Sequence, residues 1–282
     1  MKDWQKQSAS ILCLVLIVVS AWQWPESHLL VRWGLVALWT GGFILCLGYS
    51  VAGRPLGVLI NEQNVMSLSR FQTAFWTVII VSALVVILSV RIQHSLSDVL
   101  NIKFTTGLLE LLGISAVSLV GSPLIESTKK GKEPTDSSLT QTSAALRQNG
   151  LAPKSVSEQV KAAVGEVAKT NSVKVAIDDN NQGLLYKNPS ISDARFSDMF
   201  RGSEVGNFAQ MDLAKVQMFF FTLLVGVAYA YALAGLLSSQ DVIGDSVSMP
   251  QLTDGMVGLL AISNGSYLGS KAVVHTPSPS EA

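Results

Sequence analysis

Long apolar runs separated by short polar stretches make up most of the chain outside residues 126–206. The first run, Ala9 to Trp24, is followed by a turn at Pro25 to His28 and a second run, Leu29 to Tyr49. A helix needs about 20 apolar residues to cross a hydrocarbon core of about 30 Å. The pattern predicts a transmembrane hairpin over residues 1–54, with a cleaved signal peptide as the alternative for the first run.

Four further apolar runs come in two pairs, each with one strong and one weaker member: Phe71 to Val90 with Phe104 to Ile125, and Val216 to Leu237 with Gly255 to Ser270. Backbone polar groups in lipid must be satisfied internally, so each run is predicted to be a helix. Residues 71–125 and 207–272 are therefore two-helix units. A polar connector, residues 55–70, precedes the first unit.

A sequence echo relates these two units. Residues Ser67 to Thr77 return in weaker form at Asp212 to Thr222, an offset of 145 (212 minus 67). The echo keeps a cation and a glutamine at the start of each strong run: Arg70, Gln72, Lys215 and Gln217. Because the cation occupies the same position in both copies, both are predicted to start from one side of the membrane. The weak runs must then cross it completely rather than fold back.

The predicted fold is an all-α membrane protein with six transmembrane helices, built as an N-terminal hairpin plus two parallel two-helix repeats. Of the 20 basic residues, only Arg32, Arg91 and Lys103 then fall on one side of the bilayer. The other 17 (20 minus 3) share the opposite side with both termini. The positive-inside rule makes that side the cytoplasm and places the chain in the cell (plasma or inner) membrane.

Residues 126–206 are predicted to be a partly disordered cytoplasmic insert between the repeats. Glu126 to Gly150 contains mainly small polar and charged residues, which favours disorder. Ser155 to Glu158 fits a capping box that opens an amphipathic helix. A second amphipathic helix is predicted from the i, i+3, i+4 spacing of Phe196, Met199 and Phe200. This face would either lie on the bilayer surface or dock a partner, and residues 273–282 would form a disordered tail.

The composition changes this picture little but excludes several classes of function. The chain has 49% apolar and 14% charged residues and no net charge, as a membrane protein would. No basic block is present, which argues against nucleic acid as a partner. The three histidines are far apart, and neither a phosphate-binding glycine loop nor a nucleophile motif occurs, so no metal, no cofactor and no enzymatic activity are predicted.

Polar residues inside the weak runs are the main candidates for a functional site. An ionised carboxylate at Glu110 would cost about 2.5 to 3.5 kcal/mol at the bilayer centre. Glu110 would either handle ions or protons, or reach water at the nearby loop. The other candidate intramembrane polar residues are Ser115, Ser263 and Asn264.

Residues at the repeat boundary and in two rows of small side chains suggest structural roles. Arg70 and Lys215 are expected to be interfacial cations, while Gln72 and Gln217 would form interhelical hydrogen bonds. Small residues spaced by four would let helix backbones approach closely: Gly226, Ala230 and Ala234, and Ala261, Gly265 and Gly269. This packing would occur within one chain or in a homo-oligomer.

Two hypotheses for function follow. In the first, the chain is a non-catalytic membrane scaffold or anchor that presents the insert to an unknown cytoplasmic protein. In the second, it is an oligomeric ion channel or transporter lined by the weak runs. The first is favoured because most polar residues lie in the insert, whereas the second accounts better for the weak runs.

Overall fold

The computed structural model describes residues 3–23, 28–94, 98–148, 150 and 181–279. The protein is 70% helical. The chain divides into two compact units. Unit 1 comprises Met1–Val58, Arg70–Val117 and Phe219–Asn264. Unit 2 comprises Leu59–Ser69, Ser118–Met218 and Gly265–Ala282.

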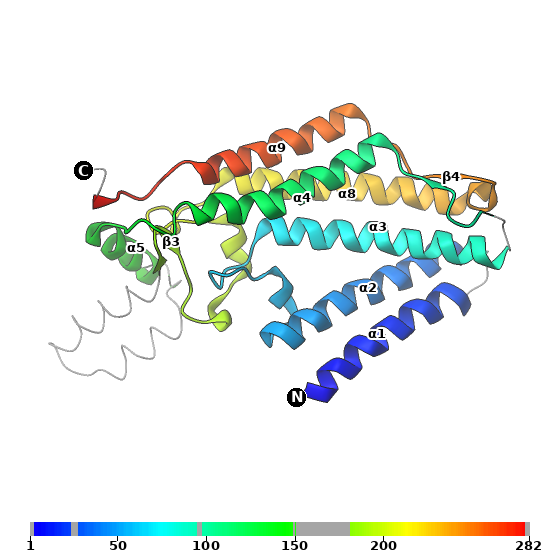
Figure 1. Cartoon of the computed structure of the whole chain (residues 1–282), viewed down its shortest axis with the longest axis horizontal. Helices are drawn as coiled ribbons and strands as arrows, with labels where there is room; N and C mark the ends of the chain where they lie inside the picture. The colour runs from blue at the N-terminus through cyan, green and yellow to red at the C-terminus, as the bar shows by residue number, and fades with distance from the viewer. Residues whose placement is uncertain (1–2, 24–27, 95–97, 149, 151–180, 280–282) are drawn as a thin grey trace. The chain divides into compact units, whose positions relative to one another are not determined.

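Seven α-helices occur in the described part of the chain: α1 (Asp3–Gln23), α2 (Leu29–Ala52), α3 (Leu68–Gln93), α4 (Thr106–Ser127), α5 (Asp136–Gln148), α8 (Leu213–Ser238) and α9 (Asp254–Ala272) (Figure 1). The strands are two residues long: β1 (Ile102–Lys103), β2 (Asn181–Gln182), β3 (Leu185–Tyr186) and β4 (Val247–Ser248). Four short 3₁₀ helices complete the described elements: η2 (Pro55–Leu59), η3 (Ile191–Asp193), η4 (Phe196–Phe200) and η5 (Gln240–Ile243).

Four of the described helices, α2, α3, α4 and α8, are long and apolar enough to cross a membrane. This agrees with the prediction of a helical membrane protein. The apolar part of α1, Ser8–Gln23, is shorter, and α9, at 19 residues, is not among the four. Six crossings and the two repeats therefore stay predictions.

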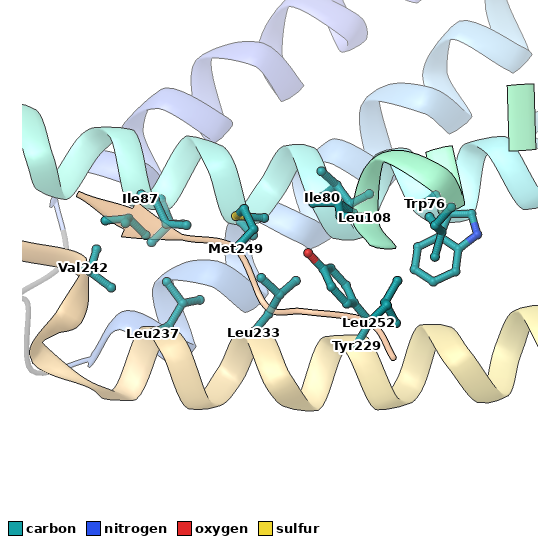
Figure 2. Packing of buried hydrophobic residues seen from close by; sticks show 14 of the residues in the cluster. Trp76, Ile80, Ile87, Leu108, Tyr229, Leu233, Leu237, Val242, Met249 and Leu252 are labelled. Carbon is teal, nitrogen blue, oxygen red and sulfur yellow. The ribbon is translucent and has the colours of Figure 1, made fainter. Parts of the chain in front are cut away.

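The core of unit 1 is an apolar cluster to which its six helices all contribute. Figure 2 shows Trp76, Ile80 and Ile87 of α3 on the side facing Tyr229 and Leu233 of α8. The Trp76 and Tyr229 rings meet edge to face, with centroids 6.2 Å apart. This apolar contact surface joins α3 to α8 within unit 1.

Glycine at position 226 allows α3 and α8 to approach closely. A Cβ atom there would lie 2.2 Å from Cε1 of Phe75, which is closer than real Cβ atoms come to their neighbours. Any larger residue would therefore displace the Phe75 ring or the helix itself. The structure thus places Gly226 where α3 and α8 approach closely.

Arg91 connects two loops of unit 1. Its fully buried guanidinium donates hydrogen bonds to the carbonyl oxygens of Val99 (3.0 Å), Asp98 (2.7 Å), Gly244 (2.7 Å) and Asp245 (3.1 Å). Beside it, β1 pairs with β4 in parallel, with Ile102 opposite Val247. The planar fork of five N–H donors suits this role, since it satisfies carbonyls from both loops at once.

Unit 2 is more ordered than the sequence predicts. Residues 126–150 were expected to be disordered, but α4 continues to Ser127 and α5 forms from Asp136. Leu146 packs in a small core with Tyr186 and Phe208, whose rings stack with centroids 3.5 Å apart. The low apolar content was misleading because α5 needs only one large side chain for this core. Its polar face is held by a hydrogen bond from Thr142 to the Val205 carbonyl oxygen (2.5 Å).

The C-terminal segment also differs from the disordered tail that was predicted. Thr276 and Ser278 are buried, and the Gly206 N–H donates to Oγ1 of Thr276 (2.9 Å). The Thr135 N–H donates to the carbonyl oxygen of Pro277 (3.2 Å). Hydrogen bonds of this kind can order a segment of short polar residues even when its sequence contains no apolar pattern. The capping-box helix predicted from Ser155 lies outside the described residues.

Candidate functional site

Two buried ion pairs lie in unit 2. Nζ of Lys129 lies 2.5 Å from Oε1 of Glu204, with side-chain exposures of 3% and 0%. Nζ of Lys271 lies 2.5 Å from Oε1 of Glu126, with exposures of 6% and 8%. Charges this deeply buried lose their hydration and are retained only when they are well paired.

Hydrogen bonds extend the Lys129–Glu204 pair to the C-terminal segment. The Lys129 ammonium also donates to the carbonyl oxygens of Lys271 (2.5 Å) and Val273 (2.7 Å). The second carboxylate oxygen of Glu204 accepts from the N–H groups of His275 (2.9 Å) and Thr276 (2.8 Å). This pair therefore joins the end of α4, the insert and the segment after α9.

The Lys271–Glu126 pair is extended by neighbouring helix residues. The Lys271 ammonium donates to Oγ of Ser122 (2.5 Å) and lies 5.2 Å from the centroid of the Tyr267 ring. The Tyr267 hydroxyl is also hydrogen-bonded to Ser122 Oγ (3.2 Å). The ends of α4 and α9 are thus connected by a network of charged and polar groups.

A polar recess of about 380 Å³, including the part open to solvent, lies next to this network in unit 2. Its charged lining residues are Glu126, Asp198, Lys215 and Lys271. The remaining lining comes mainly from residues 61–68 and from the insert. Its lining brings several polar and charged side chains together around a small space.

The Asp198 carboxyl at this recess sits in a partly desolvated environment. Burial raises its pKa, against the opposing effects of the Arg195 N–H and of the guanidinium groups of Arg201 and Arg195. The Arg195 N–H donates to Oδ2 of Asp198 at 2.7 Å. Burial also raises the pKa of the Tyr186 phenol and lowers that of Arg201.

The four predicted intramembrane polar residues differ in burial. Ser115, Ser263 and Asn264 are buried in unit 1, and Asn264 Nδ2 donates to the Leu260 carbonyl oxygen (2.8 Å). Glu110 is instead exposed on the surface of unit 1. The structure therefore does not bring Glu110 together with the other three.

The boundary residues of the two proposed repeats have different surroundings. Lys215 is buried in unit 2, whereas Arg70 is half-buried. Gln72 is 1% exposed and its amide has no hydrogen-bond partner among the described residues, whereas Gln217 is exposed. A matching sequence position thus does not give a matching environment.

The two rows of small residues also differ from each other. Gly226 is buried, and Ala230 and Ala234 are half-buried. Ala261, Gly265 and Gly269 are exposed, and a Cβ atom on Gly265 or Gly269 would meet nothing within 4 Å. The second row therefore does not mediate close packing within this chain, because it lies on the outward face of α9.

Phe196, Met199 and Phe200 do not form one exposed amphipathic face. They lie on the 3₁₀ helix η4, where Met199 is 1% exposed and Phe196 is 51% exposed. Phe200 is half-buried, with its ring centroid 5.6 Å from that of Phe196. Because a 3₁₀ helix aligns positions i and i+3, its winding does not explain why Met199 is buried and Phe196 exposed.

Sequence reasoning missed Lys129, Glu204, Lys271 and Arg91 as buried charges. The available signal was the placement of Glu126, Lys129 and Lys271 at the ends of apolar runs, where snorkelling to water is the usual interpretation. Their pairing depends on contacts between distant segments, which a single sequence does not reveal.

Comparisons with protein-family models, curated proteins and solved structures find no match to this chain. In the described residues, no three His, Cys, Asp or Glu side chains are grouped to hold a metal ion.

Proposed function

We propose that the chain is a non-catalytic membrane anchor whose unit 2 presents a surface to a cytoplasmic protein. The observation that carries this proposal is the buried Lys129–Glu204 pair, which holds the last part of the insert against the residues that directly follow α4. An anchor needs such a connection because a flexibly attached surface pays a larger entropic cost on binding. The pair supplies a rigid attachment between these two segments.

The proposed architecture has six crossings, two parallel repeats and both termini on the cytoplasmic side of the cell membrane. Two facts support the repeats: α3 and α8 have the same length, 26 residues, and β1 pairs with β4 at the offset of the sequence echo, 145 (247 minus 102). The distribution of Lys and Arg supports the orientation.

The exposed Phe196 side chain is the proposed contact of this anchor with its partner. Phe196 is 51% exposed, and Ile191 on the neighbouring η3 is 37% exposed. Exposed aromatic side chains on an ordered surface are favoured anchors of protein interfaces. We therefore expect Phe196→Asp to remove the cross-links that unit 2 forms in native membranes while leaving membrane insertion unchanged.

Cross-linking mass spectrometry on intact membranes checks this expectation. Ser197→Asp is the matched control, because it adds the same charge at the next position without removing an apolar side chain. If Phe196→Asp retains the same cross-linked proteins as the wild type, the anchor proposal is wrong.

A channel or transporter is the second candidate, and buried polar atoms in unit 1 favour it. The hydroxyls of Ser115, Thr222 and Ser263 have no hydrogen-bond partner among the described residues. Buried polar groups without partners are costly, and in membrane helices they often mark a pathway for a solute. Ser115 and Ser263 also match in a second sequence echo, in which Leu111 to Ser115 returns as Leu259 to Ser263 at an offset of 148 (263 minus 115).

Ion flux into proteoliposomes tests this second candidate. We expect Ser115→Leu and Ser263→Leu to reduce flux strongly, because they replace polar lining with apolar bulk, and Glu110→Gln, at an exposed position, to leave it unchanged. Wild-type flux equal to that of empty vesicles would eliminate this candidate.

A further inference from the structure

The polar recess of unit 2 contains a buried ammonium group with unused donors. Lys215 is 6% exposed and lines the recess. Its ammonium carries three N–H donors. Among the described residues, the Lys215 ammonium donates a hydrogen bond to one acceptor, the carbonyl oxygen of Arg201.

The carboxylates around Lys215 are occupied by other donors. Glu126 accepts from the Lys271 ammonium at 2.5 Å. Asp212 caps α8, with Oδ1 accepting from the N–H groups of Ala214 (3.0 Å) and Lys215 (3.3 Å) and Oδ2 from the Ser270 hydroxyl (3.3 Å). These carboxylates lower the electrostatic cost of burying the Lys215 ammonium. They do not accept hydrogen bonds from its remaining N–H donors.

Asp198, the other acidic group near Lys215, is similarly engaged. Its carboxylate accepts hydrogen bonds from the backbone N–H groups of Arg195 and Met66, and the guanidinium groups of Arg201 and Arg195 lie near it. The negative charges around the recess are therefore balanced by groups other than Lys215.

The position of Lys215 selects the chemistry of a ligand. It is the third residue of α8, a helix long and apolar enough to cross a membrane. The start of such a helix lies at the depth of lipid headgroups. Asn61, Gln63, Ser67 and Ser203 add amide and hydroxyl groups to the same recess. A lysine ammonium accompanied by such donors binds phosphate oxygens well.

We propose that this recess binds a phosphate group through the Lys215 ammonium. The phosphate belongs either to a phospholipid headgroup or to a free phosphate. The role of Lys215 extends beyond the orienting cation expected from the sequence, and it does not depend on the partner contact proposed at Phe196.

Binding to the purified full-length chain tests the proposal, with native mass spectrometry as the readout. The probes are phosphatidylglycerol, inorganic phosphate and, as a lipid without phosphate, diacylglycerol. We expect retention of phosphatidylglycerol or inorganic phosphate but not of diacylglycerol. Lys215→Met should weaken retention about tenfold or more, because a hydrogen bond to a charged group is lost. Arg70→Met, which removes the corresponding cation outside the recess, should leave retention unchanged.

A second measurement uses the unmodified protein and does not depend on the folding of a variant. Dipolar coupling between ¹⁵N-labelled lysine and ³¹P should appear in the wild type when the retained probe is present. Competition by inorganic phosphate against phosphatidylglycerol identifies a free phosphate site, and no competition identifies a headgroup site. Absence of the coupling, equal retention by Lys215→Met, or equal retention of diacylglycerol would each overturn the proposal.

Discussion

Replacing Glu204 by glutamine is expected to lower the free energy of unfolding by about 3 to 5 kcal/mol, because it leaves the Lys129 ammonium buried without its counter-charge. Glutamine keeps the size of the side chain but presents an amide donor in place of one carboxylate oxygen. The glutamate accepts from Lys129, His275 and Thr276, so three hydrogen bonds are weakened together. Reversible denaturant unfolding in detergent micelles measures the loss.

An exposed ion pair of the same unit provides the matched control. Lys130 and Glu62 lie 2.7 Å apart, with side-chain exposures of 29% and 66%. Glu62→Gln should cost at most about 1 kcal/mol, because water already screens that pair. Equal losses for Glu62→Gln and Glu204→Gln would show that burial does not set the strength of these pairs.

A double substitution distinguishes the stability lost with the ion pair from the cost of leaving one charge buried without a partner. Lys129→Met with Glu204→Leu removes both charges and should recover much of the stability lost in Glu204→Gln. The segment containing His275 and Thr276 should stay less protected from hydrogen exchange in this double variant, since its acceptor is gone. A double variant as unstable as Glu204→Gln would contradict this interpretation.

Arg91→Met is expected to lower the free energy of unfolding by about 3 kcal/mol or more and to loosen both loops that the guanidinium connects. Four carbonyl oxygens lose a charged donor at once. The substitution should also weaken the backbone hydrogen bonds between β1 and β4. The amides of Val247 and Met249, which donate to the carbonyl oxygens of Asn101 and Lys103, should exchange with deuterium much faster.

Two further variants test the geometric part of this argument. Arg91→Lys keeps the charge but not the planar fork, so it should restore only part of the stability and protection. Lys103→Met removes an exposed cation from β1 and should have little effect. Full rescue by lysine would mean that charge alone, rather than the fork of donors, holds the loops.

The strong apolar runs were predictable because their chemistry is local. The run Phe71 to Val90 contains no charge, and α3 covers it. The polar stretch of α5 was not predictable, because its order depends on the contacts of Leu146 and Thr142 with segments far along the chain. Phe196 and Met199 likewise share a helical spacing but differ in burial, since the spacing does not show which side chains are covered by the rest of unit 2.

The sequence by itself determined that this protein is helical and suited to a membrane, because long apolar runs can satisfy their backbone only as helices in lipid. Only the tertiary structure decided which of its charged side chains are buried and which are exposed. Lys129 and Glu204 are 75 residues apart and exclude water only when the insert packs against the end of α4. Lys215 is a buried donor at a recess of unit 2 and Glu110 is exposed on unit 1, because burial of a charge depends on long-range contacts.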